Sequence, residues 1–411
     1  MVKLGLIPFS SNLCDRQALN AEHEALLAEL HTRFEISFIE PEEIDRVDVA
    51  LIFIANGGVE AKFREMYPRF SHALPLLADG LHNSLAAAME ILTWLKNHKA
   101  SSEILHGDIQ DIISRINRLY RINIARKKLK ETVVGVLGGP SGWLIAGRIE
   151  PLHIHRDWGI AFRKIEFQEF QEYRDRVRDS EVKDLTAEIT EKAESIEGPI
   201  ESDIMKSIRL YIAMKNMVEE LHLQAVTVRC FDFIPEGITG CLALSLLNNI
   251  GIIAGCEGDC QTVCTMLLAN LLTDEIPFMA NPSLIDKRKN EIVLAHCTVA
   301  THLAKRFCLR SHFESGIGVA IQGKFKPGPV TLLKWGGSHL HRSFISAGKL
   351  VKNLEDPRLC RTQIEIALNE SVEYFLRDPI GNHHVVVSGD HVEILKEFLA
   401  STPNREDRPV I

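Results

Sequence analysis

The sequence Cys256-Glu257-Gly258-Asp259 follows an apolar run, ALSLLNNIGIIAG at residues 243–255, that contains no charged side chain. A carboxylate carried by so apolar a segment is costly to bury unless it is paired, hydrogen-bonded or bound to a metal ion. Glu257 is therefore the first candidate for chemistry. The alternative is a structural carboxylate that backbone amides or an arginine satisfy.

Strands and helices alternate on both sides of this stretch as far as residue 272. Apolar strands are expected at residues 2–9, 34–40, 47–54, 74–78, 132–137 and 225–230, and helices at residues 16–33, 84–96, 106–130, 203–222 and 261–272. Such alternation is typical of parallel, doubly wound sheets. It predicts two Rossmann- or flavodoxin-like α/β domains, at residues 1–130 and 131–273, and the second domain carries Glu257.

The last third of the chain has a different pattern. Short β-rich runs punctuated by Gly and Pro occur at residues 291–296, 316–322, 330–334 and 384–389, with helices expected at 356–375 and 392–399. This pattern favours an antiparallel or barrel-like sheet. We therefore expect residues 274–411 to form a β-barrel-containing α+β domain. Its polar tail, residues 401–411, is expected to be frayed or docked on a partner subunit.

Composition narrows the class of protein. The 411 residues are 45% apolar and 25% charged, which is typical of a globular chain with more than one domain. A net charge of -8 argues against a nucleic-acid partner, because phosphate attraction needs a basic surface. The N-terminus lacks the apolar core of a signal peptide, and no apolar run reaches the roughly 20 residues of a membrane span. We expect a cytoplasmic protein with no membrane partner.

The cysteines predict packing more than metal binding. Nine cysteines is an odd number in a large chain, so a disulfide framework is not expected. Cys256, Cys260 and Cys264 recur at every fourth residue and would share one face of a helix. A soft-metal site is the alternative, but the spacing is not that of structural zinc, and cysteine also packs as a small hydrophobe.

A glycine-rich turn, Gly138-Gly139-Pro140-Ser141-Gly142, follows the strand expected at residues 132–137. It matches neither a Walker loop nor the dinucleotide-binding fingerprint. The favoured interpretation is a plain tight turn at the mouth of the sheet. The alternative is a turn that contacts substrate, because ligands of open α/β sheets bind at the carboxyl ends of the strands.

The order and spacing of seven motifs resemble the L-fucose/L-arabinose isomerase superfamily, and more closely its shorter fucose-isomerase-like members. The motifs are Ser141-Gly142-Trp143-Leu144, Cys256-Glu257-Gly258-Asp259, Phe278-Met279-Ala280-Asn281, Leu294-Ala295-His296-Cys297, His312-Phe313-Glu314-Ser315-Gly316, Gly328-Pro329-Val330-Thr331-Leu332 and Gly381-Asn382-His383-His384. The resemblance implies two α/β domains, a C-terminal β-barrel and a homo-oligomer, a trimer or hexamer, with active sites at subunit boundaries.

The resemblance also implies a reaction: metal-dependent interconversion of an aldose and a ketose through an ene-diol, usually with Mn²⁺. This chemistry moves a proton between C2 and C1 of a monosaccharide, and a divalent cation can bind the carbonyl and hydroxyl oxygens and stabilise the charge that develops on them. Carboxylates then act as acid and base. Oxygen ligands with one imidazole suit Mn²⁺ or Mg²⁺ better than zinc.

Residue by residue, the resemblance makes Glu257 the first metal-binding and catalytic carboxylate and His383 the C-terminal metal ligand, with His384 as the neighbouring alternative. The implied substrate-binding residues are Ser141, Trp143, His296, Glu314 and His384. Plainer interpretations stay open. His296 is otherwise a satisfied core histidine, His383 and His384 are turn residues, and Glu314 is a rim residue.

The second catalytic and metal-binding carboxylate of the family falls on Asn281. An amide oxygen can ligate a metal, but an amide cannot act as a base. Asp259, Asp286 and Glu314 are possible substitutes. The departure leaves three functions open: an aldose–ketose isomerase, a sugar-binding or regulatory homologue without turnover, and a metal-dependent enzyme of altered chemistry such as an epimerase or aldol-type lyase.

Overall fold

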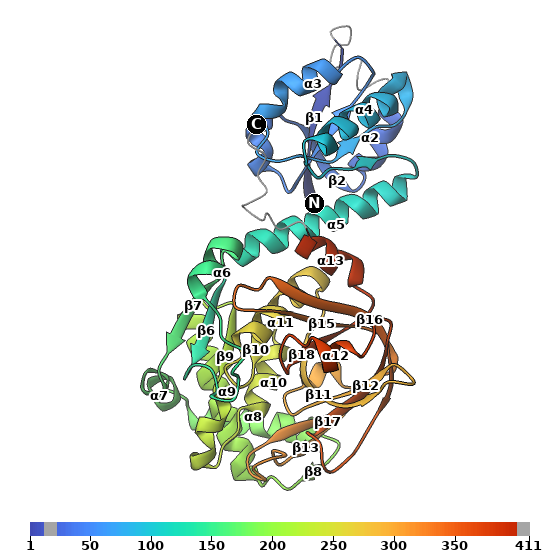
Figure 1. The fold of residues 1–411 in the computed structure, drawn as a ribbon. Coiled ribbons are helices and arrows are strands. Elements are labelled where there is room, and N and C mark those ends of the chain that lie inside the picture. The colour runs from blue at the N-terminus through green and yellow to red at the C-terminus, as the bar shows by residue number, and fades with distance from the viewer. Residues whose placement is uncertain (12–22, 401–411) are drawn as a thin grey trace. The chain divides into compact units, whose positions relative to one another are not determined.

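The computed structural model describes residues 1–11 and 23–400, and these residues form two compact units within Met1–Ala125 and Arg126–Ala400 (Figure 1). The division falls inside α5 (Ile109–Lys130). The domain boundaries at residues 130/131 and 273/274 stay predictions. The start of the helix expected at residues 16–33 and the tail at 401–411 lie outside the described residues. Among the described residues, no helix has both the length and the apolar character that crossing a membrane requires.

The first unit contains a five-stranded parallel sheet in the order β2-β1-β3-β4-β5. Its strands are β1 (Val2–Phe9), β2 (Phe34–Phe38), β3 (Val49–Ile54), β4 (Leu76–Leu77) and β5 (Ile104–Leu105). Its helices are α2 (Glu24–His31), α3 (Glu60–Met66), α4 (Ser84–Asn97) and the first part of α5. Every residue of the central strand β3 is buried, because separate apolar clusters cover the two faces of the sheet.

The second unit begins with a four-stranded parallel sheet in the order β10-β9-β6-β7. Its strands are β6 (Val133–Leu137), β7 (Ala161–Ile165), β9 (Ala225–Val228) and β10 (Ile253–Gly255). The helices of this part are α6 (Pro151–Trp158), α7 (Phe167–Asp175), α8 (Asp179–Lys192), α9 (Glu201–Glu220), α10 (Cys241–Asn249) and α11 (Cys260–Thr273). Numbered within its own sheet, this order is 4-3-1-2, which the first four strands of the first unit share.

The chain then closes a six-stranded antiparallel barrel in the order β11-β12-β17-β16-β15-β18. The barrel strands are β11 (Phe278–Asp286), β12 (Glu291–His296), β15 (Gly328–Gly336), β16 (Arg342–Asn353), β17 (Thr362–Leu368) and β18 (His384–Ser388). A small sheet contains β8 (Ile196–Glu197), β13 (Arg306–Arg310) and β14 (Ala320–Lys324), and the last helices are α12 (Tyr374–Arg377) and α13 (Val392–Ala400). The predicted fold class, parallel α/β domains followed by a C-terminal barrel, is confirmed.

One expected element is wrong. The segment 356–375 expected to be a helix contains the strand β17 between two loop segments, and α12 covers only its last two residues. Ile364, Ile366 and Leu368 are buried, whereas Glu365 and Ala367 between them are partly exposed. This alternation has the period of two that a half-buried strand requires. The helix expected at residues 392–399 is confirmed by α13.

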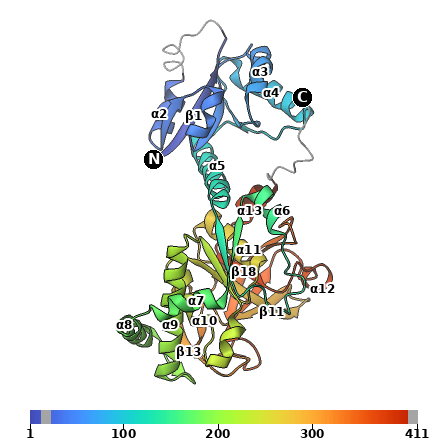
Figure 2. The ribbon, with the colours of Figure 1, turned by 90° about the vertical axis from the view of Figure 1, so that its left-hand side faces the viewer.

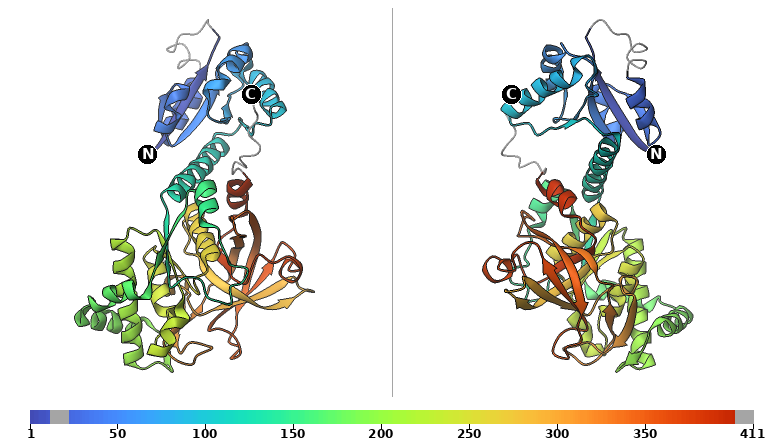
Figure 3. Two further views of the ribbon diagram at one scale, coloured as in Figure 1. Left: turned by 60° about the vertical axis from the view of Figure 1, so that its left-hand side comes forward. Right: turned by 90° about the vertical axis from the view of Figure 1, so that its right-hand side faces the viewer.

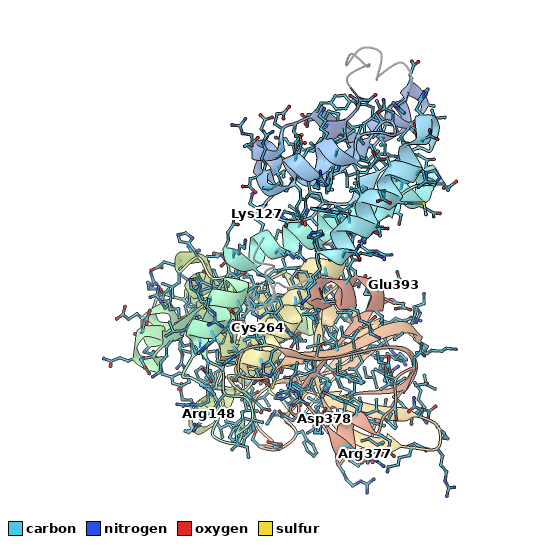
Figure 4. All side chains as sticks on the ribbon, turned by 45° about the horizontal axis from the view of Figure 1, so that its top comes forward. Lys127, Arg148, Cys264, Arg377, Asp378 and Glu393 are labelled. Atoms are coloured by element: carbon cyan, nitrogen blue, oxygen red, sulfur yellow. The ribbon has the colours of Figure 1, made fainter. Side chains whose placement is uncertain are left out.

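Helix α11 connects the central sheet to the barrel. It packs against β9 and β10 on one side and against β11, β15 and β18 on the other. Figures 2 and 3 show the barrel beside the sheet with α11 between them, and Cys264, labelled in Figure 4, marks the helix. Residues 260–269 are all buried, as expected for a helix that is apolar on every face. The start of α11 is therefore the place where sheet and barrel meet.

Candidate active site

Glu257 lies in the turn between β10 and α11. Its φ of +61° is in the left-handed region that non-glycine residues rarely adopt. Gly258 follows with φ +69°, and a Cβ on it would lie 2.3 Å from the carbonyl oxygen of Gly139. The Ser141 amide donates to the carbonyl of Glu257 at 2.9 Å, and the Gly258 amide donates to that of Val228 at 2.9 Å. The loops after β6 and β9 therefore hold a strained turn that presents Glu257 at the carboxyl ends of the strands.

The Glu257 carboxylate has two neighbours. Its Oε2 accepts a hydrogen bond of 2.6 Å from Trp143 Nε1, and its Oε1 lies 3.4 Å from His383 Nε2. Burial alone raises the pKa of Glu257, but His383 and the Trp143 N–H outweigh burial and lower it to about 2. Glu257 is therefore ionised at neutral pH, which is the state that a metal ligand needs.

His383 enters the site from the barrel, at the residue before β18. It is 0% exposed, and its Nδ1 lies 2.9 Å from Asp259 Oδ2. Within the described residues its Nε2 has no hydrogen-bond partner, although it faces Glu257. A carboxylate that holds one imidazole nitrogen and leaves the other free is the usual support of a metal-ligating histidine.

Asp259 is itself held from two directions. It accepts hydrogen bonds from the Thr262 amide at 2.8 Å and the Thr262 hydroxyl at 2.7 Å, so it also caps α11. Lys334 of β15 is 1% exposed, and its Nζ lies 3.8 Å from Asp259 Oδ2. Burial raises the pKa of Asp259, but Lys334 and His383 outweigh burial and lower it well below its usual range. The sequence analysis missed Lys334, although a lysine within the apolar strand Leu332-Leu333-Lys334-Trp335 is a signal for a buried charge pair.

His296, at the end of β12, completes the group. Its Nδ1 lies 2.8 Å from the Thr298 hydroxyl, so Nε2 is the nitrogen left for a ligand. Burial, with a contribution from His383, lowers the pKa of His296 to about 4, so the ring is neutral at pH 7. One ligand atom from each of Glu257, His296 and His383 lies within 4.8 Å of the other two.

This donor set fits a divalent metal ion. A buried imidazole nitrogen without a hydrogen-bond partner is unusual, and a cation between His383 and Glu257 would satisfy it. Two imidazoles with one carboxylate suit a transition-metal ion better than Mg²⁺, which prefers oxygen ligands. The sequence analysis expected one imidazole here, whereas the structure brings two histidines to Glu257.

Asn281 of β11 lies next to this group. Its Oδ1 is 3.3 Å from the side-chain amide of Asn382, the residue before His383. The two more distant substitutes considered for a second carboxylate are elsewhere: Asp286 caps the turn at the far end of β11, and Glu314 is exposed. The third, Asp259, is engaged with His383.

Among the described residues, the side chains of two other predicted substrate-binding residues, His384 and Ser141, make no hydrogen bond to the Glu257 carboxylate, although the Ser141 amide donates to the Glu257 carbonyl. His384 packs against Phe344 and Phe375, and its Nε2 lies 3.0 Å from the Tyr374 hydroxyl. Successive residues of an extended chain point to opposite faces, so His384 faces away when His383 faces the site. The hydroxyl of Ser141 is buried without a hydrogen-bond partner among the described residues.

Trp143, one of the predicted substrate-binding residues, belongs to an aromatic wall beside Glu257 whose other members, Phe231 and His312, were not predicted as site residues. Trp143 is 52% exposed, and its ring lies 5.0 Å from that of Phe231, edge to face. Phe231 in turn lies 5.5 Å from His312. Phe231 follows β9 at the same edge of the sheet as Glu257, in the short 3₁₀ segment Cys230–Glu236. Aromatic residues directly after a predicted strand were the available signal.

Cys256, Cys260 and Cys264 do not converge on one point. Cys256 Sγ lies 3.0 Å from Cys230 Sγ, whereas Cys260 Sγ faces the carbonyl of Gly258 at 3.6 Å. Among the described residues, the groups of His, Cys, Asp and Glu with metal-like spacing contain no cysteine. The packing interpretation agrees with this arrangement.

The fold and the site define a class of protein: parallel α/β domains and a barrel, with a carboxylate–histidine group where sheet and barrel meet. No family model matches the chain. Over 383 residues the chain is 24% identical to two proteins named sulfoquinovose isomerase, from Priestia aryabhattai and Priestia megaterium, and the alignment covers 88% of this chain and 84% of each relative. This similarity supports a relation to sugar isomerases. The narrower assignment to the L-fucose/L-arabinose isomerase superfamily stays a prediction.

Proposed function

We propose that the chain is a metal-dependent aldose–ketose isomerase that acts on a monosaccharide through an ene-diol. The observation that carries the proposal is the free Nε2 of His383, which Asp259 orients toward the ionised carboxylate of Glu257. The relatives named sulfoquinovose isomerase support a sugar as the substrate class. Sulfoquinovose is therefore the first substrate to test, beside a panel of ordinary aldohexoses.

In this proposal Glu257, His296 and His383 hold the ion, with Asn281 beside them. A divalent cation held by these residues would supply stabilisation of negative charge on the sugar oxygens. Asp259 fixes the ring of His383, and the Trp143 N–H fixes the Glu257 carboxylate. Glu257 is the group proposed to carry the proton between C2 and C1.

The aromatic wall formed by Trp143, Phe231 and His312 is proposed as the face on which the sugar lies. Aromatic rings offer flat apolar surface to the C–H face of a sugar, and Trp143 also offers the N–H that Glu257 uses. A sugar on this wall would be next to the carboxylate. The wall therefore positions substrate, whereas Glu257 reacts.

A second candidate function is a sugar-binding homologue without turnover. The observation that favours it is Asn281, a neutral amide at the position where the resemblance implies the second carboxylate. Such a protein would hold the cation and the sugar but would not exchange the proton at C2.

Deuterium exchange distinguishes the two candidates. The protein is supplied with Mn²⁺ and incubated with each aldose in heavy water, and deuterium at C2 of the aldose and in the ketose is measured. We expect exchange with at least one sugar, and loss of both exchange and bound Mn²⁺ in Glu257→Gln. The matched control is Glu188→Gln, on the exposed face of α8. Sugar binding without exchange would favour the second candidate, and absence of bound metal in the unaltered protein would contradict both.

Two further expectations stay predictions: the trimeric or hexameric homo-oligomer that the resemblance implies, and the cytoplasmic location that the N-terminal sequence and the apolar runs suggest.

A further inference from the structure

A second group of potential metal ligands lies outside the candidate active site. Glu150 directly precedes α6, His153 lies in the first turn of α6, and His339 lies in the turn between β15 and β16. One ligand atom from each of the three residues lies within 4.8 Å of the other two. The proposed isomerase reaction uses none of them.

The three side chains already converge on one point. Glu150 Oε2 lies 2.8 Å from His153 Nδ1 and 3.2 Å from His339 Nε2. The two imidazole rings stack with centroids 4.2 Å apart and planes 10° apart. In a tetrahedral zinc site with bonds of about 2.0–2.1 Å, neighbouring ligand atoms are about 3.3–3.4 Å apart. The two carboxylate–imidazole distances are within roughly half an ångström of that spacing, and the stacked rings would have to turn out of their parallel planes for both nitrogens to face one ion.

The backbone that carries these ligands is held independently of them. The Glu150 amide donates to the carbonyl of Ser338 at 2.9 Å, and Trp158 Nε1 donates to that of His339 at 3.3 Å. Gln261 of α11 adds a bridge, because its Oε1 accepts from the Gly337 amide at 3.2 Å. Two segments that are distant in the sequence are thus joined before any ion binds, which reduces the ordering cost of binding.

The group is accessible and has suitable chemistry. The side chains of His153, His339 and Glu150 are 41%, 35% and 52% exposed, so an ion reaches them from solvent and keeps a water ligand. Two imidazoles with one carboxylate and an open position form a donor set that binds Zn²⁺. We propose that Glu150, His153 and His339 form a second divalent-metal site, for Zn²⁺ or a similar transition-metal ion, separate from the Glu257 group.

The position of this site suggests what it does. The loop between β6 and α6 carries Trp143, which donates to Glu257, and ends at Glu150; Arg148, labelled in Figure 4, marks this loop. The turn that carries His339 follows β15, the strand of Lys334. Gln261 also donates to the carbonyl of Arg148 at 3.2 Å. A bound ion would clamp the loop to the turn and stabilise the second unit, because it binds only the folded chain.

Zinc binding tests the proposal without any measurement of activity. The full chain carrying Glu257→Gln is stripped with chelator, and Zn²⁺ binding is followed by equilibrium dialysis. We expect one equivalent of bound Zn²⁺ in this background, and affinity at least ~10-fold weaker after His153→Gln or His339→Gln, since even outer partners of a metal cost 10–100-fold. The control is His155→Gln on the same helix, whose Nδ1 faces the carbonyl of Gly159 at 3.0 Å and which should keep the affinity.

Thermal unfolding supplies the second readout. Zn²⁺ should raise Tm in the Glu257→Gln background and in the His155→Gln control, but not after His153→Gln or His339→Gln. Glu150→Gln gives a third variant, because it removes only a charge from an exposed side chain and should fold. Unchanged zinc affinity in all three ligand variants would overturn the proposal. The isomerase proposal would be unaffected, because its metal readout depends on Glu257.

Discussion

The two parallel sheets share a strand order, yet the carboxylates at their carboxyl edges have different surroundings. In the first unit, Asp79 follows β4, and its Oδ2 lies 2.5 Å from His23 Nδ1. Its Oδ1 accepts from the Leu81 amide at 3.0 Å and the Ser84 hydroxyl at 3.3 Å. All of these partners belong to the same unit, and both carboxylate oxygens are engaged. Asp79 therefore stabilises its own loop.

In the second unit the partners of Glu257 come from a different layer. His383 and His296 are barrel residues, and the Nε2 of His383 has no hydrogen-bond partner among the described residues. A parallel sheet thus places a carboxylate at its edge in both units, as open α/β sheets commonly do. The barrel adds the buried imidazoles that turn such a carboxylate into a candidate metal group.

Asp259→Asn should have the largest effect on stability. It removes the anion beside the buried cation of Lys334, and breaking a buried pair from one side costs about 3–5 kcal/mol. It also releases the ring of His383, so Mn²⁺ affinity should fall about 10–100-fold. Urea unfolding followed by tryptophan fluorescence measures the first effect, and Mn²⁺ titration measures the second.

Asp79→Asn is the matched change in the first unit. It should lower the free energy of unfolding by about 1.5–3 kcal/mol, the usual contribution of a hydrogen bond to a charged group, and should leave the Mn²⁺ affinity unchanged. Adding Lys334→Met to Asp259→Asn should restore part of the lost stability, because it removes the unpaired charge. Equal effects of the two aspartate changes on Mn²⁺ affinity would contradict the distinction between the two sheets.

Gly258→Ala and Gly58→Ala compare the backbone turns at the carboxyl edges of the two parallel sheets. Alanine at φ +69° costs about 1–2 kcal/mol, and its Cβ would also meet the carbonyl of Gly139 at 2.3 Å, so the total loss should be about 2–4 kcal/mol. Gly58 in the first unit has φ +81°, and no atom lies within 4 Å of the Cβ that an alanine would add. Gly58→Ala should therefore lower the free energy of unfolding only by the about 1–2 kcal/mol that alanine costs at a positive φ. Equal losses of stability in the two variants would mean that the backbone at Glu257 relaxes and removes the contact between the new Cβ and the carbonyl of Gly139.

Lowering the pH should destabilise the second unit through His296 and His384, two buried histidines whose pKa values are lowered. Burial lowers the pKa of His384 to about 3 and that of His296 to about 4, below the ordinary 6.5. Because the unfolded chain then binds more protons, stability falls as the pH drops through 6.5 toward 4, by about 2 kcal/mol per histidine at pH 5. His384→Gln should flatten this dependence in metal-free protein, as measured by urea unfolding between pH 7 and pH 5. His302→Gln, at an exposed position, controls for the loss of a histidine as such.

The sequence predicted parallel sheets and an apolar setting for Glu257 because both depend on local pattern. Apolar strand-like runs alternate with segments of helical periodicity, and an uncharged segment directly precedes Cys256 and Glu257. The partners of Glu257 depend on the closure of the barrel. His383 and Asp259 are separated by 124 residues and meet only when β18 packs against α11. The motif resemblance therefore named His383, but no spacing in the chain showed its contact with Asp259 or the burial of Lys334.

Trp143→Phe should have the smallest effect on stability. It distinguishes the role of the aromatic wall from the role of the hydrogen bond to the Glu257 carboxylate. Phenylalanine keeps an aromatic face toward Phe231 but removes the N–H that donates to Glu257 at 2.6 Å. Because Trp143 is 52% exposed, the loss of stability should be below about 1 kcal/mol. The free carboxylate should bind Mn²⁺ in a less fixed geometry, so kcat should fall more than KM rises, whereas Trp143→Ala should raise KM as well. An unchanged kcat in Trp143→Phe would show that the barrel histidines alone position Glu257.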